Sequence, residues 1–367
     1  MSSPQAIVGL AGRNAVRRPE CGIFRRLCRA EGELCLPVYA EDKREALALF
    51  RELGLFGMFL LEPWSEGPLA SADGLEAIDT IASDGAGATA GFSAAAAARR
   101  CREAGCGAER GGELGFSVCR AAAALGRIRG QAAFTDHADL CRAAAASEQA
   151  AASEQAAAPE QAAASAPRGS IPAGIALVGL MAAGKSATGR ALARALDLPF
   201  LDSDTMVEEE AGMSVAEIFE REGEPSFRSR EKRALRRAEA SLPCVLALGG
   251  GAVLAPENRA LLSRSFATVW LHVTAATAAR RATSPGSPLR PLLGAAGVPS
   301  AAPGPGAAGA IAGDPAPPPS DRAAILARIF EERRALYAEC ADLVVSTESR
   351  GPEAVAEVIR AEIDIAR

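Results

Sequence analysis

Histidine is almost absent from this sequence, because His137 and His272 are the only two among 367 residues. A reaction that depends on imidazole acid–base chemistry is therefore not expected. The nine cysteines include no C-x-x-C pair. They predict free buried thiols in a reducing compartment, and they argue against a zinc site or a redox role.

The sequence also lacks long apolar runs and a strong charge of either sign. No apolar segment approaches the length of a membrane-spanning helix, and the N-terminus lacks the residue order of a signal peptide. A net charge of −5 gives no reason to expect nucleic acid or an anionic membrane as a partner. A cytoplasmic location is the resulting expectation.

The chain is long enough for two domains, each with its own hydrophobic core. A hexad of Ser, Glu, Gln and Ala begins at Ser147 and repeats at Ser153, and it lacks aromatic residues. Such composition is typical of a linker that is partly helical or disordered. We therefore predict a domain at 1–145, a linker at 146–172 and a second domain at 173–367.

The first domain alternates short apolar runs with amphipathic segments, a pattern typical of a small α/β domain. The expected strands of this part are Ala6–Leu10, Leu34–Tyr39 and Gly57–Leu61, and the expected helices are Glu20–Ala30 and Lys43–Leu53.

The second domain repeats β-α-β units, which predict a parallel five-stranded sheet flanked by helices. A segment rich in Gly, Pro and Ala, residues 294–320, has no periodicity and predicts a mobile loop. The expected strands are Ile175–Val178, Pro199–Leu201, Val245–Leu248, Thr268–Val273 and Leu343–Val345, and the expected helices include Thr188–Leu196, Val215–Arg221, Arg228–Ala240 and Arg322–Cys340.

Gly179–Ser186 fits the pattern G-x-x-x-x-G-K-S/T, and it stands between a predicted strand and a predicted helix. In this setting the backbone N–H groups and the helix N-terminus bind phosphates, while Lys185 reaches the terminal phosphates. The Ser186 hydroxyl can bind Mg²⁺. An ordinary strand-to-helix turn is the alternative, but the flanking elements favour a nucleotide site.

Two carboxylates, Asp202 and Asp204, follow the second strand of this domain, at the end of the sheet where α/β proteins bind ligands. Helix capping by these residues is the alternative, and it is compatible with catalysis. Arg228 is predicted to lie in the first turn of a helix, where the helix dipole disfavours a cation. This placement implies a partner, either an internal acidic residue or an anionic substrate.

Further candidates come later in the chain. The triplet Gly249–Gly251 follows a buried strand and permits close approach of a ligand. Arg290 borders the predicted mobile loop, where closure would bring it over ATP. Arg333 lies on a late helix, where it would otherwise be an ordinary solvated residue.

Together these motifs resemble those of the shikimate kinases, in order and spacing, over residues 174–367. The resemblance implies a P-loop kinase fold and transfer of the ATP γ-phosphate to the 3-hydroxyl of shikimate. It implies that Asp204 polarises that hydroxyl and that Lys185 and Arg290 stabilise the transferring phosphoryl group.

The resemblance also implies the binding residues. The substrate would contact Asp204, Arg228, Arg333 and the triplet Gly249, Gly250 and Gly251, and Mg²⁺ would bind Ser186 and, through water, Asp202. ATP would contact Gly179, Ala182, Ala183, Gly184, Lys185, Ser186, Ala187, Arg281, Arg290 and Pro352. The chain departs from the family at Ala182 and Ala183, where a glycine is common, and at Ala187, where a threonine is common.

In the first domain, three segments resemble the substrate-binding domain of shikimate dehydrogenase: Phe56–Ser65, Glu76–Ile81 and Gly91–Ala95. The family's catalytic lysine falls at Ser65 and its aspartate at Ala95, and no G-x-G-x-x-G dinucleotide motif follows. The family's asparagines fall at Phe59, Asp79 and Ser93, and its carboxylate-binding serines fall near Val16 and Arg18. The resemblance implies a domain that has lost catalysis and cofactor; the alternative is an unrelated α/β domain.

Other readings of the whole chain remain open at this point. The acceptor could instead be gluconate or a nucleoside monophosphate, although two arginines beside an Asp-x-Asp pair favour shikimate. The first domain could also be a binding or scaffolding module that contacts other enzymes of the aromatic pathway.

Overall fold

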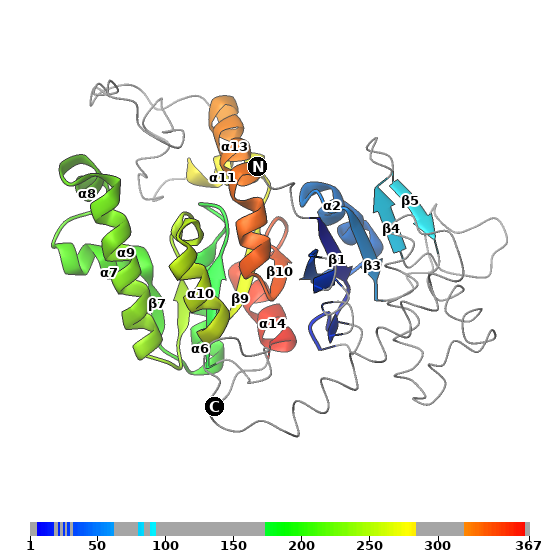
Figure 1. Cartoon of the computed structure of the whole chain (residues 1–367), viewed down its shortest axis with the longest axis horizontal. Coiled ribbons are helices and arrows are strands. Elements are labelled where there is room, and N and C mark those ends of the chain that lie inside the picture. The colour runs from blue at the N-terminus through cyan, green and yellow to red at the C-terminus, as the bar shows by residue number, and fades with distance from the viewer. Residues whose placement is uncertain are drawn as a thin grey trace. The chain divides into compact units, whose positions relative to one another are not determined.

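The computed structural model describes residues 6–17, 21–22, 25, 28–29, 32–61, 80–83, 89–92, 173–283 and 319–363 (Figure 1). The chain divides into two compact units. The first comprises Met1–Ser170, Ala341–Val345 and Ala361–Asp364, and the second comprises Ile171–Cys340, Ser346–Arg360 and Ile365–Arg367. The predicted linker at 146–172 and nearly all of the 294–320 segment lie outside the described residues.

The first unit is built on a mixed sheet with the strand order β5-β4-β3-β1-β2-β10. β1 pairs in parallel with β2 and β3, whereas β3, β4 and β5 are successively antiparallel. The sequence predicted strands β1, β2 and β3 and helix α2, but it did not predict β4 or β5. The bounds are β1 Ile7–Ala11, β2 Leu34–Val38, α2 Lys43–Glu52, β3 Gly57–Leu60, β4 Thr80–Ser83, β5 Thr89–Phe92 and β10 Leu343–Ser346.

The predicted strand Leu343–Val345 is present as β10, and Ala341–Val345 group with the first unit. Val344 pairs with Val38 of β2, and the Tyr39 N–H donates to the Val344 carbonyl over 2.9 Å. The first unit is therefore assembled from the two ends of the sequence.

The second unit contains an all-parallel sheet with the order β9-β6-β8-β7. No helix in the described part of the chain is long and apolar enough to cross a membrane. The strands and helices are β6 Gly174–Val178, α6 Lys185–Leu196, β7 Phe200–Asp202, α7 Ser203–Ala211, α8 Val215–Arg221, α9 Gly223–Ala240, β8 Val245–Ala247, the 3₁₀ helix η2 Ala252–Leu254, α10 Pro256–Ser265, β9 Phe266–His272, α11 Ala275–Ala282, α13 Pro319–Cys340 and α14 Pro352–Glu362.

Helices α6, α9 and α13 begin earlier than expected, and one of these differences changes an interpretation. α6 begins at Lys185 because Gly184 caps it in the left-handed conformation, with φ +89°. α9 begins at Gly223, and Pro225 is tolerated in its first turn. Arg228 is therefore in the second turn of α9, so the argument from an unfavourable first-turn dipole was wrong.

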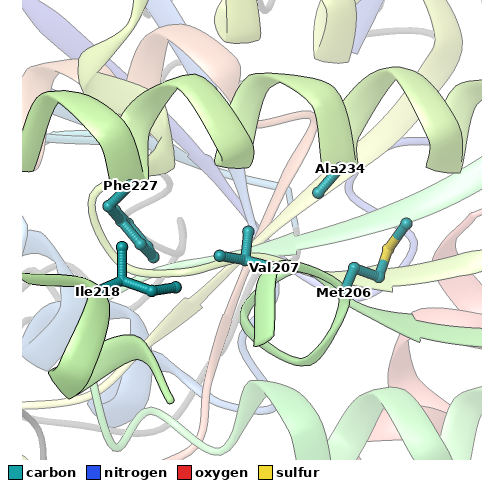
Figure 2. Close-up of a cluster of buried hydrophobic side chains, with 5 residues drawn as sticks. All are labelled: Met206, Val207, Ile218, Phe227 and Ala234. Carbon is teal, nitrogen blue, oxygen red and sulfur yellow. The ribbon is translucent and has the colours of Figure 1, made fainter. Parts of the chain in front are cut away.

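Helices α7, α8 and α9 pack together beside edge strand β7 through a small apolar cluster (Figure 2). Val207 and Ile218 are fully buried, and the Phe227 ring lies 4.8 Å from that of Phe219. Met206 and Val207 follow Asp204 on α7, and Phe227 precedes Arg228 on α9. This cluster therefore fixes the backbone on which two of the predicted site residues stand.

Candidate active site

The loop Gly179–Gly184 joins β6 to α6, as the phosphate-loop pattern predicted. A side chain at Gly179 would come within 2.4 Å of the Leu271 carbonyl oxygen, and φ there is +136°. The Lys185 ammonium is buried and donates to the carbonyl oxygens of Gly179 and Leu180 over 3.0 and 2.9 Å. The loop is thus wrapped around a cation, with a helix N-terminus beside it.

Ala182 holds a left-handed conformation, with φ +59°. A residue with a Cβ atom pays roughly 1–2 kcal/mol for this region of φ, whereas glycine adopts it freely. The preference of the family for glycine in this pair of positions therefore has a backbone cause. Ala183 and Ala187 show no such strain and contribute backbone to the loop and to α6.

Ser186 and Asp202 meet although sixteen residues separate them. The Ser186 hydroxyl donates to Asp202 Oδ2 over 2.6 Å, and Asp202 Oδ1 accepts from the Asp204 N–H over 3.0 Å. Asp202 is thus the N-cap of α7, so the capping alternative is correct for one of its oxygens. Its second oxygen and the Ser186 hydroxyl form a pair of hard oxygen donors at the end of the phosphate loop.

The glycine triplet contacts the acidic residues through Gly249. A Cβ atom on Gly249 would lie 2.7 Å from Asp204 Oδ1 and 3.2 Å from Glu231 Oε1, so both carboxylates face this backbone. The buried Ser203 hydroxyl accepts the Gly249 N–H over 2.9 Å. Gly249 and the start of α7 are therefore held at one fixed separation.

The next two glycines contact the two arginines. The Gly250 carbonyl oxygen accepts from Arg333 Nη1 over 3.0 Å and from the Tyr337 hydroxyl over 2.7 Å. A Cβ atom on Gly251 would lie 2.6 Å from Arg228 Nη2. Arg228, Arg333 and Asp204 come from three helices, and the triplet is what brings them together.

Arg228 is held by two carboxylates on its own helix. Its Nη1 donates to Glu231 Oε2 over 3.0 Å, and its Nε and Nη2 donate to Glu224 Oε1 over 3.1 and 3.0 Å. Burial lowers the pKa of Arg228, but the charges of Glu231 and Glu224 outweigh burial and raise it. The guanidinium is therefore a permanent cation with a fixed orientation.

Glu231 is a residue of this site that the sequence reasoning missed. It is completely buried, and its burial raises the pKa of the carboxyl group despite the opposing charge of Arg228. It lies three residues after Arg228 on α9, and the i to i+3 spacing was a signal that could have identified it. Tyr337, four residues after Arg333 on α13, is another such residue, and its hydroxyl donates to the Gly250 carbonyl oxygen.

Arg281 contacts the segment that lies between β10 and α14. Arg281 of α11 donates to the Thr347 hydroxyl over 3.1 Å and to the Thr347 carbonyl. Glu348 accepts from the Thr274 N–H over 3.1 Å and also from the Thr277 hydroxyl, and Pro352 then begins α14. Arg290 lies outside the described residues.

Comparison with known proteins decides the family. The family pattern described as shikimate kinase matches residues 181–364, which is half of the chain. The chain belongs to the shikimate kinase family. It is an enzyme that uses ATP to phosphorylate shikimate.

Relatives within the shikimate kinase family cover the same part of the chain. The enzyme of Symbiobacterium thermophilum is 42% identical over 186 residues, which are 50% of this chain and 93% of that relative. The enzyme of Moorella thermoacetica is 40% identical over 190 residues, 52% of this chain and 94% of the relative. For the enzyme of Ruegeria pomeroyi, identity is 54% over 97 residues, 26% of this chain and half of the relative.

Among solved structures, a shikimate kinase from Acinetobacter baumannii in complex with shikimate aligns over 52% of this chain and 91% of that chain. Its sequence identity is 30% and its TM-score is 0.43.

Replacing Gly251 by Ala should raise the KM for shikimate about 10- to 100-fold with little change in the unfolding temperature. The backbone at Gly251 has φ −101°, which alanine adopts, but the new Cβ atom would displace the Arg228 guanidinium. The loss of one charged hydrogen-bond partner is worth roughly 1.5–3 kcal/mol. Steady-state kinetics would check this, with Gly351→Ala as the control, since Gly351 has nothing within 4 Å of its added Cβ. An unchanged KM for shikimate would contradict the prediction that Arg228 binds the substrate.

Proposed function

We propose that the enzyme transfers the γ-phosphoryl group of ATP to the 3-hydroxyl of shikimate around the triplet Gly249–Gly251. The supporting observation is that this triplet brings together the Asp204 carboxylate and two guanidinium groups, which arrive from three separate helices. A hydroxylated carboxylic acid offers complementary groups to both, because its carboxylate pairs with arginines and its hydroxyl with the aspartate.

Arg228 and Arg333 would bind the substrate carboxylate. The Arg228 side chain is only about one-fifth exposed, so only a small part of it is open to a ligand. Glu224, whose side chain is nearly half exposed, holds the Nε and Nη2 groups of Arg228. The substrate carboxylate would exchange with that exposed carboxylate, whereas the buried Glu231 keeps Nη1 in place.

The phosphate loop would hold the triphosphate. Its backbone N–H groups and the N-terminus of α6 bind the phosphate oxygens, and Lys185 would move from the loop carbonyls onto the β- and γ-phosphates. Ser186 and Asp202 fit a magnesium ion, because two adjacent hard oxygens together with phosphates and waters are its usual ligands. The bound ion would neutralise charge on the triphosphate.

The reaction transfers one phosphoryl group and one proton. The 3-hydroxyl oxygen forms a bond to the γ-phosphorus as the bond to the β,γ-bridging oxygen breaks, and ADP leaves. Asp204 would accept the hydrogen bond from the attacking hydroxyl and take its proton as the new bond forms. Lys185 would stabilise the charge on the transferring group, and we propose that Arg290 does the same.

The acceptor can be tested directly. The full-length enzyme, with ATP and Mg²⁺, should consume ATP in proportion to shikimate, and gluconate and nucleoside monophosphates should support little turnover. Mass spectrometry and ³¹P NMR would locate the phosphate on the 3-hydroxyl. Equal turnover with gluconate, or ATP loss that does not depend on shikimate, would contradict the proposal.

Replacing Arg228 by Lys should raise the KM for shikimate about 10- to 100-fold and leave the KM for ATP unchanged. Lysine keeps a positive charge beside the buried Glu231 but lacks the planar fork that binds a carboxylate with two hydrogen bonds. Arg228→Ala is less informative, because it leaves a buried carboxylate unpaired and should destabilise the fold.

The matched control for this variant is Arg230→Lys. Arg230 lies on the same helix, but it pairs with Glu222 and Glu210 and contacts none of the glycines described above. If Arg228→Lys raises the KM for both substrates, or if Arg230→Lys has an equal effect, then Arg228 supports the fold and does not bind the substrate.

We also propose that the first unit is a relative of the dehydrogenase substrate-binding domain that no longer catalyses hydride transfer. The three segments of the resemblance adjoin, because Thr80 pairs with Phe59 of β3 and with Phe92 of β5. Phe59, at one of the family's asparagine positions, is fully buried and apolar. Ser65, Asp79, Ser93 and Ala95 lie outside the described residues.

A binding role toward other enzymes of the aromatic pathway would be tested on the intact chain. Residues 1–145 alone would lack β10, which pairs with β2, and would therefore lack part of their own sheet. Full-length enzyme carrying an affinity tag should retain neighbouring enzymes of the pathway from an extract, and surface substitutions in the first unit should abolish this. Retention unaffected by such substitutions would argue against the role.

A further inference from the structure

The loop that follows β1 holds a carboxylate of the chain itself. Glu362, the last residue of α14, is 2% exposed and belongs to the first unit with residues 361–364. Its Oε1 accepts a hydrogen bond from the Asn14 N–H, and its backbone carbonyl accepts from Arg17 Nε over 3.3 Å. Residues 348 positions apart in the sequence are thereby joined.

The backbone of this loop is shaped to receive an anion. The N–H groups of the three consecutive residues Asn14, Ala15 and Val16 face the Glu362 carboxylate, and the charge of Arg17 adds to their field. Successive N–H groups that converge on one point form a concave site for anions. Asn14 has φ +56°, a left-handed conformation of the kind found in such anion-binding concavities.

Glu362 fills the loop, but the two oxygens of its carboxylate are not bound equally. Glu362 Oε2 is buried and accepts no hydrogen bond of standard geometry from the described residues. Burial raises the pKa of Glu362, although the amides of Asn14, Val16 and Ala15 and the charge of Arg17 oppose this. The loop therefore stabilises a carboxylate that is otherwise costly to bury.

We propose that the loop Gly12–Arg17 is a carboxylate-binding site whose resident ligand is the Glu362 side chain, and that a small free monocarboxylate binds there when this side chain is removed. The folded helix α14 holds Glu362 at the loop, so its effective concentration there far exceeds the millimolar concentration of a free carboxylate. A free carboxylate therefore competes poorly in the natural protein and binds readily once the tethered one is absent.

The test is chemical rescue of the intact protein. Glu362→Ala should lower the thermal unfolding temperature, and sodium formate or acetate should raise it again in a saturable manner with an apparent Kd on the order of millimolar. Sodium chloride at the same ionic strength should not. The natural protein should show no saturable response. Glu357→Ala is the matched control, because Glu357 lies exposed on the same helix and forms an ion pair with Arg360.

A second variant keeps the proposal testable if Glu362→Ala does not fold. Glu362→Gln has the same shape but one oxygen acceptor and no charge, so it should unfold at a lower temperature than the natural protein and show no rescue. Natural stability of Glu362→Gln would overturn the proposal. So would an acetate response in Glu362→Ala that is no larger than the chloride response.

Discussion

Replacing Asp204 by Asn should lower kcat by about 10²- to 10⁴-fold, the usual contribution of a group that takes a proton in the transition state. Gly249 packs closely against Asp204, because a Cβ atom on Gly249 would lie 2.7 Å from Asp204 Oδ1. Asn has nearly the same shape as Asp, so this packing should be kept. The KM values should change little, because the hydroxyl interaction strengthens mainly as the bond to phosphorus forms. Steady-state kinetics with both substrates would measure this.

The matched control is Asp197→Asn. Asp197 is an exposed aspartate in the same unit, at the end of α6, and its φ of +56° suits asparagine. It should leave kcat unchanged. If Asp204→Asn keeps full activity, or if both variants lose activity equally, the role given to Asp204 is wrong.

Replacing Lys185 by Met should lower kcat by about 10²- to 10³-fold, as the loss of one preorganised charge donor commonly does. Methionine fills similar space, but it can satisfy neither the Gly179 nor the Leu180 carbonyl oxygen. The loop would then hold a highly charged triphosphate without its cation. The KM for ATP should rise as well, because the same ammonium binds the ground state.

Lys232→Met is the control for this variant. Lys232 forms an exposed ion pair with Glu257 at 3.2 Å, and such pairs contribute little to stability. Circular dichroism should show both variants folded. A Lys185→Met enzyme with natural kcat would exclude the ammonium from the transferring phosphoryl group.

The sequence predicted those parts of the site whose geometry is local. The phosphate loop lies within eight consecutive residues between a strand and a helix, so its arrangement follows from short-range rules. Asp202 was expected at the end of β7, and it lies there both as a helix cap and as the acceptor of the Ser186 hydroxyl.

The parts that could not be predicted depend on contacts between distant segments. Nothing local in the sequence shows that the Gly250 carbonyl oxygen accepts hydrogen bonds from Arg333 and Tyr337, more than eighty residues away. The place of β10 beside β2 has the same cause, because strand pairing is decided by tertiary packing more than by propensity. The start of α9 at Gly223 was predicted five residues too late, at Arg228.

The pairing of β2 with β10 also has a consequence for synthesis on the ribosome. Strands β1 to β5 end at Phe92, whereas β10 begins at Leu343. At roughly 5–20 residues per second, the roughly 250 residues between them take about 12–50 s to translate. During that interval β2 has an unpaired edge in the nascent chain, the kind of edge that invites wrong partners. The first unit to be started is thus completed only when nearly the whole chain has been made.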